Sequence, residues 1–282
     1  TLIRKRGIMV RFWSSLSCIV LIALLVVDTV RSYFSGVRLT RVKDAKLVSF
    51  DKEVKLGSGR TLVVLGTYAA DFNAIEYLQR LKYYLPQLQK DCGVASFKVI
   101  LNATPASAQR LADLVDLPKQ VEVYSDPTGT AGKSFGVNRG WLSENKNISP
   151  YVKLFGMFFG LGGKETIPSV IGGYLGNPNS DAKQDWITES LRQGTLVGRF
   201  PGSALKLDPR DGSILVNRFE ELPFVSDWGQ KPLELATLRL QNMVGISLEN
   251  WKDLKPGDDE LDVLTQLGGV LVVDKNKKFL FE

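Results

Sequence analysis

Runs of apolar residues divide the chain into predicted strands and helices. Residues 61–65 (Thr-Leu-Val-Val-Leu) are continuously apolar apart from the first, which is typical of a central strand covered on both faces. After a short turn, apolar residues recur at steps of three and four along 72–88, and Gly93 then ends the predicted helix. Asn73 and Glu76 have the spacing of a capping box at its start. The pattern therefore predicts one strand followed by one long helix.

The same arrangement continues along the chain. Residues 97–101 predict a second strand, and Thr104-Pro105 begins a second helix, which Pro118 ends. Residues 121–124 predict a third strand. Because strands joined by helical crossovers become parallel neighbours, we expect a parallel sheet.

Two hairpins are expected to flank this sheet. Residues 46–60 indicate a pair of short strands closing at Gly57–Gly59, and the final residues indicate a hairpin that turns at 274–277. We therefore predict an α/β fold, a thioredoxin-like three-layer sandwich over residues 36–282. Residues 138–263 exceed a minimal fold of this kind and are predicted to form a long insertion.

The N-terminal segment differs from the rest in composition. Residues 12–27 contain no charged side chain, and with Arg11 and Asp28 at the headgroups the apolar span extends over residues 8–30, roughly 34 Å as a helix. That length favours a single-pass membrane anchor within residues 1–35. The alternatives are a signal-like leader and a buried helix. The residues expected to contact lipid or partner helices are Phe12, Trp13, Leu21, Leu24 and Leu25.

The net charge and the reactive residue types exclude several classes of function. The first 50 residues carry nine Lys or Arg and two Asp, whereas the whole chain has a net charge of +6, so the body is nearly neutral. A neutral body argues against nucleic acid as a partner. The chain has no His and only two Cys, which excludes Ser-His-Asp and Cys-His catalysis, His-ligated zinc and four-thiolate clusters. We accordingly predict neither a metal nor another cofactor.

The turn between the first strand and the first helix is where thiol enzymes of the thioredoxin class carry their nucleophile. A helix N-terminus favours a thiolate there, because it offers unpaired N–H groups and a positive dipole end. In this chain the turn contains no cysteine, and Asp71 or Asn73 is expected to use those N–H groups as a helix cap. A small ligand bound near this turn is a further hypothesis. We call the following residues the vestigial site: Thr67, Tyr68, Ala70, Asp71 and Asn73.

Cys92 is the other cysteine of the body, and Cys18 lies inside the apolar N-terminal span. Cys92 is expected at the far end of the same helix, roughly 25–28 Å from the turn. A structural cysteine is the simplest interpretation of Cys92, and a redox-sensing thiol is the alternative.

Residues 151–176 are aromatic, glycine-rich and apolar. A helix packed over the sheet would explain this composition. An exposed surface for lipid, pigment or another subunit would explain it too. Phe155, Phe158 and Phe159 are the candidate interaction residues of this stretch.

Three blocks of sequence resemble the peroxiredoxins of the AhpC/TSA class. In residues 123–137, a predicted strand ends in Ser-Asp-Pro and the following helix ends in Phe-Gly-Val. Residues 231–243 and 264–274 are similar to peroxiredoxin-like, AhpC/TSA-related proteins of cyanobacteria and plastids. The resemblance covers about residues 40–282.

The same resemblance shows what this chain lacks. Active relatives carry Cys-x-x-Cys or a single cysteine at the positions of Ala70 and Asn73. The proline and the cysteine of the peroxiredoxin motif Pro-x-x-x-Thr-x-x-Cys are absent as well. The resemblance therefore implies a redox-inactive member, with no catalytic residue at the vestigial site.

Together, the anchor and the resemblance predict an accessory or scaffold subunit of a photosynthetic membrane complex. The expected location is the chloroplast or cyanobacterial thylakoid membrane. The expected partners are membrane lipid and integral membrane subunits of a photosystem or antenna complex. The alternative is a weak one-cysteine thiol oxidoreductase, or a redox sensor, that uses Cys92.

Overall fold

The computed structural model describes residues 34–54, 59–162, 185–198, 205–208, 210, 214–217, 241–274 and 279–281. The strands within these residues are β1 (Arg38–Arg41), β2 (Lys46–Ser49), β3 (Arg60–Leu65), β4 (Val94–Leu101), β5 (Val121–Ser125), β6 (Leu205–Leu207), β7 (Ile214–Asn217), β8 (Gly269–Val273) and β9 (Phe279–Phe281). The helices are η1 (Val42–Asp44), α2 (Phe50–Glu53), α3 (Phe72–Cys92), α4 (Pro105–Leu114), α5 (Thr130–Phe135), α6 (Pro150–Phe158), α8 (Asp185–Leu196), α10 (Trp251–Leu254) and η3 (Asp258–Thr265). Residues 241–249 are helical as well.

The main sheet has seven strands in the order β2-β1-β5-β4-β3-β8-β9. The central strands β3, β4 and β5 are parallel, and β8 and β9 extend the β3 side in antiparallel fashion. The predicted parallel core and closing hairpin are therefore confirmed. On the other side, β1 pairs antiparallel with β5, and β2 forms the edge.

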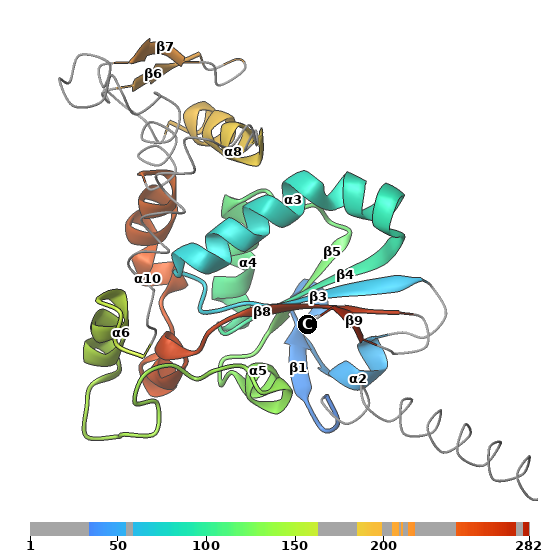
Figure 1. Ribbon diagram of the computed structural model, residues 1–282, viewed down its shortest axis with the longest axis vertical. Coiled ribbons are helices and arrows are strands. Elements are labelled where there is room, and N and C mark those ends of the chain that lie inside the picture. The colour runs from blue at the N-terminus through green and yellow to red at the C-terminus, as the bar shows by residue number, and fades with distance from the viewer. Residues whose placement is uncertain are drawn as a thin grey trace, which may run out of the picture.

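Helices cover both faces of this sheet, as Figure 1 shows: α3 and α4 lie on one side, and α2 and α5 on the other. Each side has its own buried core. Ile75 and Leu78 of α3 and Leu111 of α4 belong to the first core, whereas Phe50 of α2 and Ala131 of α5 belong to the second. The three-layer α/β arrangement fits a thioredoxin-like fold.

The continuous apolar run of β3 follows from these two cores. Leu62 and Val64 face the α3 side, and Val63 and Leu65 face the α2 side. Because successive side chains of a strand point to opposite faces, a strand covered on both faces needs apolar residues at every position.

The N-terminal hairpin is not where the sequence predicts it. Residues 46–49 pair with the preceding residues 38–41, and η1 closes the turn. They do not pair with a strand beyond Gly57, because the chain turns into α2 directly after β2. Phe50 at the start of α2 is fully buried, and its ring packs edge-on against Phe34 at 5.0 Å between centroids. Burial of this aromatic side chain decides the path that the chain takes.

The ends of the long helices are mostly as predicted. Gly93 ends α3 in the left-handed conformation with φ 63°, and the Thr104 hydroxyl caps α4 by accepting the Ser107 N–H. The prediction of a capping box at the start of α3 is wrong. Asp71 is the N-cap and accepts the Asn73 N–H, while Glu76 forms an ion pair with Arg80 at 2.6 Å.

The predicted N-terminal anchor lies outside the described residues, and with it Phe12, Trp13, Cys18, Leu21, Leu24 and Leu25. No helix in the described part of the chain combines the length and the apolar composition that crossing a bilayer requires. Described segments of the predicted insertion, residues 138–263, include α6, α8, the β6–β7 hairpin and α10. The division into residues 1–35 and 36–282 stays a prediction.

Candidate functional site at the junction of β3 and α3

The vestigial site lies at the carboxyl end of β3, where the sheet passes into α3. Thr67, Tyr68, Ala69 and Ala70 are only 2, 7, 0 and 2% exposed. This edge of a parallel sheet is the usual position of a ligand site in α/β proteins. Here it is packed with side chains, which argues against a small ligand near Tyr68.

Asp71 occupies the helix N-terminus at which a reactive thiolate would be stabilised. Its carboxylate accepts the backbone N–H of Asn73 at 2.9 Å and the Asn73 side-chain amide at 3.3 Å. Burial raises the pKa of the Asp71 carboxyl, and these hydrogen bonds offset the rise only in part. The Thr67 hydroxyl has no partner at hydrogen-bond distance among the described residues, but it is close enough to lower the same pKa. The N–H groups at the start of α3 therefore bind the Asp71 carboxylate, which caps the helix.

The helical residues 241–249 cover the junction from outside. The Ser247 hydroxyl, itself 2% exposed, donates to the Ala70 carbonyl at 2.6 Å. Met243 and Ile246 from the same segment are 1 and 0% exposed and belong to the core that contains Tyr68. Ala70 thus lies under a packed helix.

Tyr68 connects the junction to α6. Burial raises the pKa of the Tyr68 hydroxyl, and the nearby Asp71 and Tyr151 raise it further. Leu154 of α6 packs against the buried core to which Tyr68 belongs. Ser247 is a site residue that no local sequence pattern identifies, because its hydrogen bond to Ala70 joins positions 177 apart.

Cys92, the cysteine within the described residues, lies far from the junction. Cys92 is exposed and unpaired, and it is the last residue of α3, whose first residue directly follows Asp71. A helix of 21 residues is roughly 30 Å long. The predicted separation between Cys92 and the vestigial site is confirmed, so Cys92 does not substitute for a thiol at Ala70.

The Ser-Asp-Pro block has a structural role. The Asp126 carboxylate, 3% exposed, accepts the backbone N–H groups of Thr130 at 3.0 Å and Ala131 at 2.7 Å and so fixes the start of α5. Burial raises the pKa of Asp126, against the effect of these hydrogen bonds. At the end of α5, Phe135 stacks on Phe34 at 6.0 Å between centroids.

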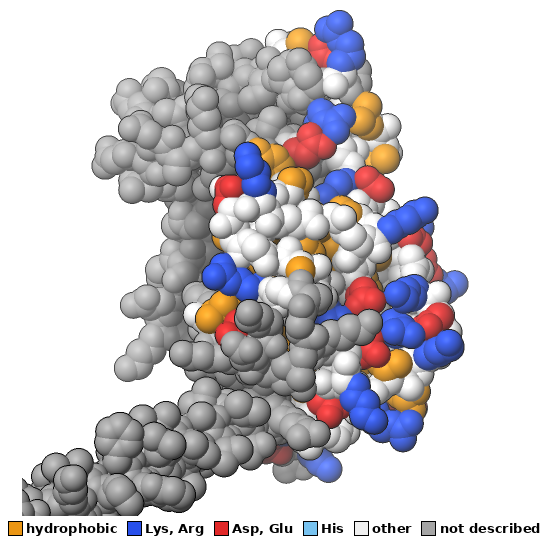
Figure 2. Space-filling model, turned by 90° about the vertical axis from the view of Figure 1, so that its right-hand side faces the viewer, with side chains coloured by type: hydrophobic (Ala, Val, Ile, Leu, Met, Phe, Trp, Pro, Cys, Tyr) orange, Lys and Arg blue, Asp and Glu red, His pale blue; other side chains and the backbone are white. Residues whose placement is uncertain are grey.

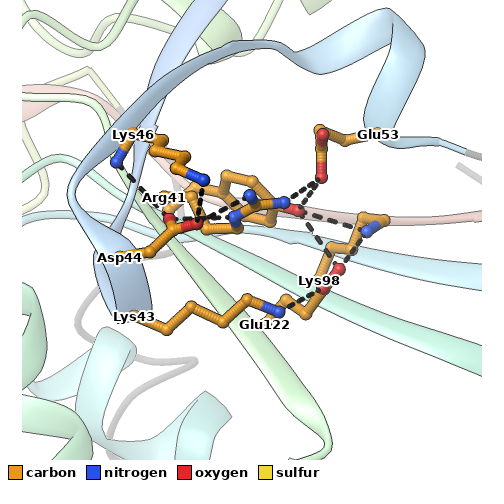
Figure 3. A network of polar contacts seen from close by, with 8 residues as sticks. Arg41, Lys43, Asp44, Lys46, Glu53, Lys98 and Glu122 are labelled. Carbon is orange, nitrogen blue, oxygen red and sulfur yellow. Dashed lines mark hydrogen bonds and ion pairs between the residues drawn. The ribbon is translucent and has the colours of Figure 1, made fainter.

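A second polar cluster lies on the α2 side of the sheet, and Figure 3 shows how its charges pair. Lys98 of β4 is 3% exposed; it forms an ion pair with Glu122 of β5 and donates to the Tyr124 hydroxyl at 3.2 Å. Tyr124 donates to Glu53 of α2 at 3.0 Å, and the Arg41 guanidinium of β1 donates to the same carboxylate at 3.1 Å. The cluster therefore ties β1 and α2 to the central sheet.

Electrostatics in this cluster indicate a structural role. Burial raises the pKa of Glu122, but the hydrogen bond and charge of Lys98, together with Lys43, outweigh burial and lower that pKa to about 2. A permanently ionised carboxylate paired with two lysines is a poor proton acceptor. On the face shown in Figure 2, positive and negative side chains are also interspersed, and apolar side chains are scattered singly.

A pocket of about 240 Å³ lies between the end of α5 and the start of β8, lined by residues 135–138 and 267–270. Its lining contains no acid, base or thiol. Within the described ranges, no three His, Cys, Asp or Glu side chains are grouped so that they could hold a metal ion. Neither feature suggests a catalytic centre.

The sheet order, and a long helix that follows β3 after a short turn, fit a thioredoxin-like fold. The sequence profile of the AhpC/TSA antioxidant enzymes matches residues 80–282. The chain therefore belongs to this family. The match begins inside α3, after the vestigial site, so it carries no information about a thiol at that site. No curated protein and no solved structure shows significant similarity to the chain.

Proposed function

We propose that this protein is a redox-inactive AhpC/TSA family member that acts as a scaffold. The observation that carries the proposal is Ala70 at the start of α3, beneath the Ser247 hydroxyl. Reduction of a peroxide requires a nucleophilic thiolate that can reach the peroxide oxygen. An alanine cannot supply one, and the neighbouring Asp71 carboxylate is already engaged as a helix cap.

The scaffold is an accessory subunit of a membrane complex. The uncharged segment 12–27 supports a single-pass anchor, and the exposed Phe155 and Phe159 support contacts outside the fold. The resemblance to proteins of cyanobacteria and plastids points to a thylakoid membrane. There the partners are membrane lipid and integral subunits of a photosystem or antenna complex, and nucleic acid is not a partner.

Two measurements on the full chain test this proposal. In detergent, peroxide consumption with a dithiol reductant should equal the rate without protein, both for the wild type and for Cys92→Ser. In solubilised thylakoid membranes, the tagged chain should co-migrate with a pigment–protein complex at a fixed stoichiometry. Peroxide turnover that survives Cys92→Ser would overturn the claim that the protein is redox-inactive. Migration as a free monomer would overturn the claim that it is a scaffold subunit.

The exposed thiol favours a second candidate function, that of a redox sensor based on Cys92. Oxidation would convert the thiolate to a sulfenic acid, with the peroxide reduced to water or an alcohol. Mass spectrometry of the Cys92 peptide after graded peroxide treatment distinguishes the two candidates. A thiol that stays reduced where an active peroxiredoxin is fully oxidised removes the sensor.

A further inference from the structure

Exposed apolar side chains gather on the outer side of α6, in the turn after it and at Leu142 before it, and we call this set the α6 face. Phe155 and Phe159 are 66 and 62% exposed, and their rings contact each other edge-on at 4.9 Å between centroids. Monomeric proteins rarely leave aromatic clusters of this kind in water. The members of the α6 face are Leu142, Tyr151, Val152, Phe155, Phe159 and Leu161, each at least 41% exposed.

The inner side of α6 is firmly packed, so this exposure does not result from a loose helix. Gly156 lies so close to the Trp141 ring that an added Cβ would come within 2.8 Å of it. The Met157 sulfur accepts the backbone N–H of Trp141 at 3.4 Å, and the ammonium of Lys153, 3% exposed, donates to the Ser143 carbonyl at 3.3 Å. The fold therefore holds the α6 face in a fixed position.

The element beside this face is acidic. η3 packs against α6, and residues 252–262 carry five acids and two lysines, a net charge of −3. Lys255 pairs with Asp258 at 2.9 Å. Asp259 and Asp262 are exposed to solvent. Arg139, whose carbonyl accepts the hydroxyl of Thr265 in η3 at 2.7 Å, is paired with Glu144.

We propose that the α6 face docks a partner protein through a basic amphipathic helix of that partner. The apolar side of the partner helix covers Phe155 and Phe159, and its Lys or Arg side chains face the acids of η3. This inference rests on the proposed scaffold function and names the contact surface that the scaffold uses.

Charge decides between this occupant and two others. An anionic lipid surface would be repelled by the net negative charge beside the face. A second copy of this chain, related by a two-fold axis, would bring two acidic η3 segments together, which costs free energy at an isologous interface. A basic helix satisfies both the apolar and the acidic part of the surface.

Site-specific photo-crosslinking in native membranes tests the docking directly. A photoreactive amino acid replaces Phe155 in the full chain, and the crosslinked peptide is identified by mass spectrometry. We expect a segment of another polypeptide with Lys or Arg on one side of an apolar helix. The matched control is Leu47, which is 55% exposed on the edge strand β2 and should give no such product.

Substitutions measure how much the apolar and the acidic residues contribute to binding of the partner. Phe155→Asp combined with Phe159→Asp should lower co-purification with the membrane complex by about tenfold or more. Asp259→Lys combined with Asp262→Lys should lower it by about threefold, with the loss reduced at high salt. Leu47→Asp should leave it unchanged. Unchanged thermal midpoints of all variants establish that they are folded.

The outcomes separate this inference from the proposed function. A crosslink from position 155 to lipid, to a second copy or to an acidic segment overturns the docking proposal. The absence of any crosslink overturns it too, if the chain still co-purifies with its complex. If the wild type does not associate with a membrane complex at all, the proposed function and this inference fail together.

Discussion

The junction of β3 and α3 and the α6 face are linked through one core, since Leu154 of α6 packs against the core that contains Tyr68, but their side chains differ sharply in exposure. At the junction, Ala69 and Ala70 are buried under the helical residues 241–249. Phe155 on α6 and Phe159 directly after it are exposed to solvent. The junction is closed, whereas the α6 face is open to solvent. This contrast is the reason for proposing a scaffold rather than a peroxidase.

The largest effect should come from opening the cover of the junction. Ile246 is fully buried, so Ile246→Ala removes packed methyl groups and leaves a cavity. We expect a loss of about 3 kcal/mol in the free energy of unfolding. Urea denaturation of the full chain in detergent measures it. A loss below about 1 kcal/mol would mean that residues 241–249 do not seal the junction.

Chemical labelling probes the same cover. In Ala70→Cys, a new thiol lies where residues 241–249 protect it, whereas Cys92 in the same chain is exposed. Alkylation at position 70 should be slower than at Cys92 by about 100-fold, because it requires local opening. Peptide-resolved mass spectrometry gives both rates in one sample. Equal rates would contradict the closed junction.

A smaller effect is expected from the single hydrogen bond across the cover. Ser247→Ala leaves the Ala70 carbonyl buried without this donor. The free energy of unfolding should fall by about 1 kcal/mol. Ser134→Ala, on the exposed side of α5, is the matched control and should have no measurable effect. If the two variants behave alike, the bond contributes nothing.

The pH dependence of stability tests the environment of Asp71. Because burial raises its pKa above 3.8, its charge costs stability at neutral pH, and the cost disappears as pH falls through the folded-state pKa. Asp71→Asn keeps a capping side chain but does not titrate. The stability difference between this variant and the wild type should therefore be larger in favour of the variant at pH 7 than at about pH 4. Urea titrations at each pH measure this difference. The opposite trend would show that the attraction between the Asp71 charge and the helix N-terminus outweighs the cost of burying that charge.

The smallest effect is expected on the α6 face. Phe155 is 66% exposed, so Phe155→Ala should change the free energy of unfolding by about 0.5 kcal/mol or less. The same substitution should weaken association with the partner. A large loss of stability, measured by thermal denaturation, would show that Phe155 belongs to the fold and not to a docking surface.

Local patterns were sufficient for the central fold. The apolar run of β3 and the three-and-four spacing along α3 depend on neighbours in sequence, and both are confirmed. The sequence does not decide which residue caps α3. Asp71 and Asn73 are both good capping residues, and only the backbone path shows that Asp71 is the cap. The N-terminal hairpin was misplaced because residues 38–41 lack a clear strand pattern, although Leu39 is buried in the second core.

The sequence by itself determined that no thiol stands at the start of α3, because that is a matter of covalent composition. It also determined the succession of strands and helices, which short-range periodicity encodes. Only the tertiary structure decided that the junction is covered and that the aromatic residues of α6 face outward. The Ser247–Ala70 bond joins residues 177 positions apart. Burial depends on such distant contacts, and an apolar stretch has the same composition whether it packs inside or remains exposed.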